Sequence, residues 1–171
     1  MTRLKNYPMT IIAVTGLLFV SIVTVMEVTA KPNTSPSNSK AYLHAYNLPA
    51  SGLALDGYCP VAYHVLNKPV KGSPEHSSIY NSVTYNFVNA DAKKYFDQNP
   101  EKYLPAYGGW CAFGMAIEDK FPVDPTNFKI VDGKLMLFLR NQNVDALKLW
   151  NQNNEESQLT KANKHWEKVS Q

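Results

Sequence analysis

Two stretches of the chain are rich in alternating apolar and polar residues, and each contains a pair of turn-forming residues. The first stretch, "SSIYNSVTYNFVN", contains Asn81-Ser82 within a run of β-branched and aromatic residues. The second, "FKIVDGKLMLFL", contains Asp132-Gly133, a pair that supplies the positive φ angles of a two-residue turn. Such runs are typical of strands joined by tight turns. The pattern therefore predicts two β-hairpins.

A helix is predicted directly after the first hairpin. Asn89 can cap a helix over "ADAKKYFDQN" by offering its side-chain oxygen to the free N–H groups of the first turn. Asp91 favours the positive end of the same helix. Pro100 ends this helix and begins a further helical turn, for which Asn99 is the cap.

Apolar residues recur at helical spacing near the C-terminus, in residues 144–153 and 156–169. We expect two amphipathic helices there, with buried positions at Leu147, Leu149, Trp150, Leu159, Ala162 and Trp166.

The remaining segments have no clean period. Residues 41–48 are expected to form an entry segment, and residues 61–65 a short strand that leads into a loop. Residues 104–115 contain three glycines and are expected to form a buried irregular segment. No internal repeat is evident. Together the elements predict a small single-domain α+β fold, with two β-hairpins or one mixed antiparallel sheet covered by three to four short helices.

The N-terminal region has the organisation of an export signal. Arg3 and Lys5 precede an apolar run over residues 9–26, and small residues follow up to Ala30. Residues 1–30 are predicted to be a signal peptide or an uncleaved signal anchor, residues 31–40 a Pro/Ser/Asn linker, and residues 41–171 the folded domain. The protein is therefore expected to be exported, periplasmic or extracellular, or else attached to the inner membrane through residues 9–26.

Composition and charge narrow the function classes. The chain is 44% hydrophobic and its net charge is +3, with Lys and Arg scattered rather than grouped. A nucleic-acid-binding surface is therefore not expected. No G-x-S-x-G, H-E-x-x-H or glycine-rich phosphate loop occurs, so the sequence does not favour an enzyme.

The chain resembles the exported YHS-domain family. The resemblance rests on "ALDGYCPVAY", "NKPVKGS", "IYNSVTYNFVNADAKKYFDQNPEKYLPAYGGWCAFGMA", "FKIVDGKLML" and "KANKHW", which cover residues 54–166. It implies a metal-related, non-enzymatic role, because relatives of the domain occur in heavy-metal transport proteins. In those relatives two cysteines lie where this chain has Val88 and Ala92, so that ligand pair is absent. Exported members carry Cys at the position of Cys111, and either Asp or Cys at that of Cys59.

Cys59 and Cys111 are the only cysteines, with 51 residues between them and no C-x-x-C pair. Outside the cytosol they can form a disulfide. Alternatively, two thiolates with an imidazole or thioether suit Cu(I) or Zn(II). A third alternative is two free buried thiols. The candidate metal ligands are Cys59, Cys111, His64, Met115 and His76.

The chain is also rich in tyrosine between residues 58 and 110. Such rings usually build the core of a small domain, and an aromatic ligand pocket is the alternative. The leading functional hypothesis is metal handling or sensing in the periplasm through one copper or zinc ion. The alternatives are a disulfide-stapled structural or interaction module without metal, and a thiol-redox protein.

Overall fold

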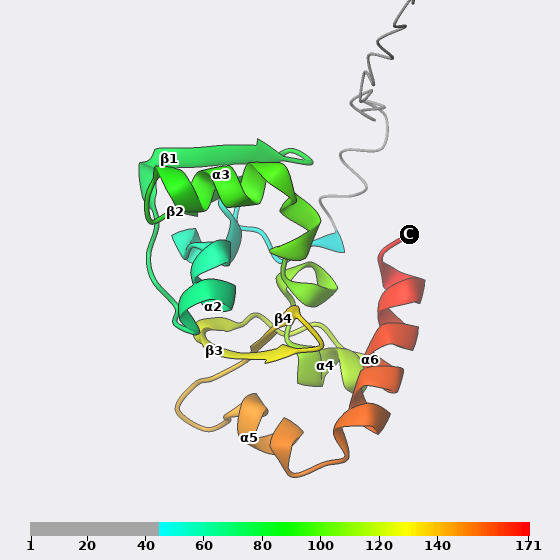
Figure 1. Ribbon diagram of the computed structural model, residues 1–171. Helices are drawn as coiled ribbons and strands as arrows, with labels where there is room; N and C mark the ends of the chain where they lie inside the picture. The colour runs from blue at the N-terminus through cyan, green and yellow to red at the C-terminus, as the bar shows by residue number, and fades with distance from the viewer. Residues whose placement is uncertain (1–44) are drawn as a thin grey trace, which may run out of the picture. The chain divides into compact units, whose positions relative to one another are not determined.

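The computed structural model describes residues 45–171, and the predicted signal segment and linker lie outside these residues. The described chain is an α+β fold, as predicted (Figure 1). Within residues 45–171, none of the helices has the length and apolar character needed to cross a bilayer. In chain order the elements are η1 (Ala54–Gly57), α2 (Pro60–Leu66), β1 (Ser73–Tyr80), β2 (Val83–Phe87), α3 (Ala90–Gln98), η2 (Pro100–Lys102), η3 (Ala106–Gly109), α4 (Ala112–Ala116), β3 (Asp124–Val131), β4 (Lys134–Phe138), α5 (Ala146–Asn151) and α6 (Glu155–Val169), where η denotes a 3-10 helix.

Both predicted hairpins are confirmed, and each forms its own two-stranded antiparallel sheet. β1 and β2 are joined by Asn81 and Ser82, with φ angles of 50° and 64°. β3 and β4 are joined by Asp132 and Gly133, with φ angles of 50° and 73°. Positive φ at both central residues matches the right-handed twist of the strands that each turn connects.

The predicted Asn89 cap is confirmed, whereas Asn99 stands at the N-cap of η2 without a side-chain cap hydrogen bond. The Asn89 side chain accepts a hydrogen bond from the Ala92 backbone N–H at 2.8 Å at the start of α3. Pro100 begins the 3-10 turn η2, as predicted. Residues 45–171 contain five α-helices rather than three to four.

Three local predictions were wrong. Residues 61–65 form part of α2 instead of a strand, because Pro60 stands at the first helical position, where its fixed φ angle favours a helix. Residues 104–115 are buried as expected, but they contain η3 and most of α4. Leu149 was predicted to be buried and is 37% exposed.

The structure contains an internal repeat that was not evident from the sequence. Residues 53–101 (the first repeat) and residues 105–155 (the second repeat) have the same order of 3-10 turn, short helix, hairpin and helix. In each repeat the residue before the 3-10 turn bridges in parallel to the second residue of the later strand, Leu53 to Thr84 and Pro105 to Leu135. The two hairpins also have the same register irregularity, between Ser73 and Ser77 and between Asp124 and Phe128.

Sequence identity between the repeats is concentrated after each hairpin. "NADAKKYFDQNPE" and "NVDALKLWNQNNE" are offset by 54 residues and share seven identical positions. Their aromatic residues are equivalent in packing, since Phe96 contacts Phe87 and Trp150 contacts Phe138, with ring centroids 5.0 and 5.6 Å apart. The repeat therefore extends from backbone geometry to the side chains that join each hairpin to its helix.

Two hydrophobic core clusters hold the fold together. The first core contains the inner faces of the first repeat together with Leu135 and Leu137 of β4. The second core contains Met136 and Phe138, from the opposite face of β4, together with residues of α4, α5 and α6. The β3–β4 hairpin thus lies between the two cores and contributes to both.

Candidate functional site

The two cysteines occupy equivalent positions in the two repeats. Cys59 and Cys111 each precede a short helix, α2 or α4, and each is 0% exposed. Both are free thiols, and they belong to different cores, Cys59 to the first and Cys111 to the second. The Cys111 Sγ accepts a hydrogen bond from the Leu139 backbone N–H at 3.3 Å. A disulfide between them is absent from this structure and stays a prediction for the oxidised protein.

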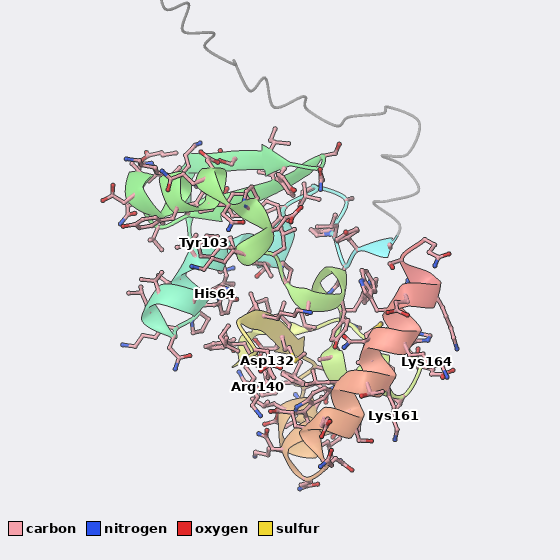
Figure 2. The ribbon with its side chains drawn as sticks, turned by 45° about the vertical axis from the view of Figure 1, so that its right-hand side comes forward. His64, Tyr103, Asp132, Arg140, Lys161 and Lys164 are labelled. Atoms are coloured by element: carbon pink, nitrogen blue, oxygen red, sulfur yellow. The ribbon has the colours of Figure 1, made fainter. Side chains whose placement is uncertain are left out.

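The other predicted metal ligands are distributed over separate elements. Met115 lies on α4 in the second core with Cys111, and it is 0% exposed. His76 lies on β1 and is half-buried. His64 lies on α2, where its ring meets the Tyr103 ring edge-on at 5.4 Å (Figure 2). Met115 therefore shares the second core with Cys111, and His64 contacts Tyr103, which belongs to the first core with Cys59.

His64 has an unusual polar environment. Its Nε2 atom is buried and finds no hydrogen-bond partner among the described residues. Burial, and to a smaller extent the charge of Lys102, lowers the pKa of this imidazole. A neutral imidazole nitrogen is a competent metal ligand, but one such group does not make a stable site.

The described residues contain no pre-assembled group of His, Cys, Asp or Glu ligands. Within residues 45–171, no three His, Cys, Asp or Glu side chains are grouped so that they could hold a metal ion. A structural zinc site takes four ligands, and the two thiols here are divided between two cores. Metal binding through Cys59 and Cys111 stays a prediction.

Equivalent left-handed turns from the two repeats line one cavity. Leu55 and Asp56 have φ angles of 55° and 49°, and the equivalent Tyr107 and Gly108 have 54° and 58°. Leu55, Asp56 and Gly108 all line a cavity of about 370 Å³, so both turns reach it. The left-handed conformation costs about 1–2 kcal/mol for a residue that carries a Cβ. Backbone strain of this kind is often retained at functional sites.

The walls of this first cavity combine apolar side chains with polar backbone and side-chain groups. Besides the two turns they include the entry segment 46–49, and residues Tyr85, Pro105, Pro122, Val123, Pro125 and Leu137. The entry segment is fixed against the second turn because Asn47 donates its backbone N–H to the Gly108 carbonyl at 2.9 Å and its Nδ2 to the Gly109 carbonyl at 3.1 Å. Ligand sites are commonly preformed cavities of roughly 300–1,000 Å³ with few polar groups.

A second cavity of about 260 Å³ shares Tyr46, Tyr85, Pro105 and Gly108 with the first. We call the two together the cleft. The second cavity is further lined by Glu101, Leu104, Ala106, Tyr107, Lys134, Asn163 and Trp166. Tyr107 is buried and donates its hydroxyl to the Asn163 Oδ1 at 3.0 Å, and burial raises its pKa to about 12. This tyrosine is therefore neutral and held in place at physiological pH.

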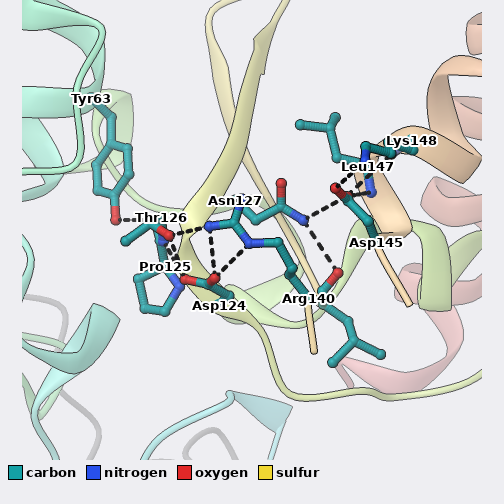
Figure 3. A network of polar contacts seen from close by, with 10 residues as sticks. Tyr63, Asp124, Pro125, Thr126, Asn127, Arg140, Asp145, Leu147 and Lys148 are labelled. Carbon is teal, nitrogen blue, oxygen red and sulfur yellow. Dashed lines mark hydrogen bonds and ion pairs between the residues drawn. The ribbon is translucent and has the colours of Figure 1, made fainter. Parts of the chain in front are cut away.

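A polar network stabilises the second repeat close to its contact with the first (Figure 3). Arg140 bonds to Asp124 and to the Thr126 hydroxyl. The buried Asn127 donates to the Leu139 carbonyl and to the Asp145 carboxylate. Tyr63 of α2 donates its hydroxyl to the Pro125 carbonyl at 2.8 Å. These contacts fix the β3 end of the first cavity wall, which includes Pro125.

Comparisons with protein-family models, with curated proteins and with solved structures found no match to this chain. The resemblance to exported YHS domains therefore rests on the motifs quoted above and stays a prediction.

The cleft was missed from the sequence, although an aromatic ligand pocket was considered. The residues of the cleft come from the entry segment, from η1, β2, η2 and η3, from the start of β3, and from β4 and α6, so their proximity depends on the tertiary fold. The sequence contains one signal of two related turns. The pattern Ala-x-x-Gly-aromatic-Cys occurs twice, at residues 54–59 and at residues 106–111.

Proposed function

We propose that this protein is an exported, non-enzymatic YHS-type module that binds a small ligand in the cleft between its two repeats. The observation that supports the proposal most directly is that both strained turns line a single cavity. The rigid proline and tyrosine walls give a preformed site, which reduces the entropic cost of binding.

The cysteines have a structural role in this proposal. Both are fully buried next to the left-handed turns, Cys59 after Tyr58 and Cys111 after Trp110. The Cys59 N–H bonds to the Val70 carbonyl at 2.8 Å, and the Cys111 N–H to the Phe121 carbonyl at 3.1 Å. These equivalent bonds anchor each turn to the chain that follows its helix. The thiols therefore fill space at the points where the cleft walls are fixed.

The proposal is tested by NMR on the full ¹⁵N-labelled chain with a set of small ring-bearing compounds that are cationic, anionic or neutral. We expect bound compounds to shift the backbone amides of Gly57, Gly108 and Gly109. The variant Pro122→Trp narrows the cleft at an exposed lining residue and should weaken these shifts at least several-fold. Pro74→Trp is the matched control, because Pro74 is exposed and lines neither cavity. The proposal is wrong if no compound shifts these amides.

A further inference from the structure

The second cavity contains a corner built from aromatic rings. Trp166 of α6 meets Tyr46 with ring centroids 6.0 Å apart and planes at 87°, and it meets Tyr107 at 6.4 Å and 72°. Tyr85 also lines this cavity. In a T-shaped contact the edge of one ring lies against the face of the other, so a ligand can contact only the ring faces that these neighbours leave uncovered. A cation within about 6 Å of such ring centroids is attracted by their negative faces.

The absence of a side chain at Gly108 allows the Trp166 and Tyr46 rings to approach each other. A Cβ at this position would lie 2.9 Å from the Trp166 ring and 2.9 Å from the Tyr46 ring, and its φ angle is +58°. The equivalent residue of the first repeat is Asp56, which is exposed. The glycine is therefore required by the approach of the two rings, since Asp56 adopts the same left-handed conformation with a Cβ.

Glu101 lines the same cavity and lacks the contacts that its equivalent in the second repeat, Glu155, makes. Glu155 in the second repeat pairs with Lys129 and accepts a hydrogen bond from the Trp150 Nε1 at 2.9 Å. Its counterpart in the first repeat, Glu101, is exposed and lines the second cavity, and its Oε1 accepts a long hydrogen bond of 3.5 Å from the Tyr80 hydroxyl. Glu101 can thus face a ligand with its charge.

The charged residues that line the cleft are Asp56, Glu101 and Lys134. The Asp56 carboxylate pairs with Lys71 at 2.8 Å, so among the described residues Glu101 is the acidic residue of the cleft with no ion pair. In the second cavity the basic lining residue is Lys134, which is exposed at the start of β4. An anionic ligand would meet Glu101 and the ring faces, both of which oppose it.

From these observations we infer that the cleft takes a small organic cation that carries an alkylated or quaternary ammonium group. The ammonium group lies in the aromatic corner with Glu101 as its counter-charge. The uncharged remainder of the ligand extends into the first cavity past Tyr46 and Pro105, which line both cavities. This inference rests on the proposed function, because it assigns a ligand class to the same cleft.

The test compares choline with 3,3-dimethyl-1-butanol, a neutral molecule of nearly the same shape, by calorimetry and NMR on the full chain. We expect choline to bind at least 10-fold more tightly. Glu101→Gln should weaken choline binding about 3- to 10-fold, and Lys134→Gln should strengthen it about 2- to 3-fold. Both residues are exposed, so both variants should fold. Glu75→Gln is the matched control, because Glu75 is exposed on β1 outside both cavities.

The possible outcomes separate the two proposals. Equal affinity for choline and the alcohol, or choline binding that Glu101→Gln leaves unchanged, would overturn the cation inference but retain the cleft as a binding site. If only anionic or neutral compounds shift Gly108 and Gly109, the cation inference is likewise overturned and the cleft is retained as a binding site. If no compound shifts the cleft amides, the proposed function fails as well.

Discussion

The two hairpins have the same turn geometry and register, yet they meet different surroundings. On the face that points away from its own helix, the first hairpin carries Ser77, Ile79, Thr84 and Asn86. The equivalent residues of the second hairpin are Phe128, Ile130, Leu135 and Leu137, which pack against the first core. Ile79 is 76% exposed, whereas the identical residue at the equivalent position, Ile130, contributes to the core.

The comparison shows that backbone geometry and burial are encoded by different residues. Turn pairs such as Asp132-Gly133 fix the hairpin in both repeats, because they act on neighbouring backbone angles. Side chains on the outward face then decide whether the hairpin faces solvent or a second core. Substitutions at equivalent positions of the two repeats test this difference.

Removing the aromatic residue that joins each hairpin to its helix should destabilise both repeats. Phe96→Ala and Trp150→Ala are each expected to lower the free energy of unfolding by about 3–5 kcal/mol, because both side chains are almost fully buried. Trp150→Ala should have the larger effect, since it also removes the hydrogen bond to Glu155. Urea unfolding followed by circular dichroism measures both values. A larger loss for Phe96→Ala would show that the Trp150–Glu155 hydrogen bond does not add to the stability in this way.

Exchanging equivalent residues on the outward face should have unequal effects. Leu135→Thr places a hydroxyl at a position that is 0% exposed and should destabilise the protein by about 2–4 kcal/mol. Thr84→Leu, at the equivalent half-buried position, should change stability by less than about 1 kcal/mol. The two midpoints of urea unfolding, compared at equal m-value, measure the difference. Similar losses in the two variants would show that the faces are equally buried.

Replacing either cysteine by alanine should lower the free energy of unfolding, and the two losses should differ only slightly. Cys111→Ala removes the acceptor for the Leu139 N–H and should cost about 1–2 kcal/mol, and Cys59→Ala about 1 kcal/mol. In native protein that has never been reduced, we expect neither thiol to react with a thiol reagent, and both to react after unfolding in denaturant. Absence of reactive thiols after unfolding would instead establish the predicted disulfide, and elemental analysis of the same sample tests for bound copper or zinc.

The smallest expected effect is that the second repeat loses stability at a higher pH than the first repeat when the solution is acidified. Partial burial acts to raise the pKa values of Asp124 and Asp145, but hydrogen bonds from Thr126 and Arg140 to the first, and from Asn127 to the second, lower both. A carboxyl group whose pKa is lowered by folding stabilises the protein above its unfolded-state pKa and loses this contribution as the pH falls. Glu155, whose pKa is lowered by bonds from Lys129 and Trp150, acts in the same direction.

The first repeat has one such carboxyl group with a lowered pKa, Asp97, to which Lys93 and Ser78 donate hydrogen bonds while partial burial opposes them. Hydrogen exchange measured while the pH is lowered below about 4 should therefore show earlier opening of α5 than of α3. Simultaneous opening, or earlier opening of α3, would show that the acidic network does not govern this difference.

The parts of the fold that follow from neighbouring residues could be predicted from the sequence. The hairpin turns and the Asn89 cap depend on interactions within a few residues. The strand predicted over residues 61–65 was wrong because Pro60 occupies the first helical position, where its fixed φ angle initiates α2. Leu149 follows the helical period but lies at the edge of α5, where no element covers it fully.

The repeat was harder to recognise because its spacing changes along the chain. Equivalent residues are 52 positions apart at the turns before the cysteines, 51 in the hairpins and 54 in the helices that follow. The core residues also differ in kind, as Tyr85 corresponds to Met136 and Phe96 to Trp150. The sequence therefore suggested that Cys59 and Cys111 bond to each other or share a metal ion. In the fold they occupy equivalent positions in the two repeats. The cleft depends on the approach of both repeats and could not be located before that relation was known.

The position of the β3–β4 hairpin between the two cores has a consequence for the folding pathway. Its strands are joined by a two-residue turn, so this hairpin can close early through contacts between near neighbours. Leu135 and Leu137 then offer one face to the first core, and Met136 and Phe138 the other face to the second. Neither core is complete until the hairpin is in place. The two repeats should therefore fold and unfold in one cooperative transition, with the folding rate most sensitive to substitutions at Asp132 and Gly133.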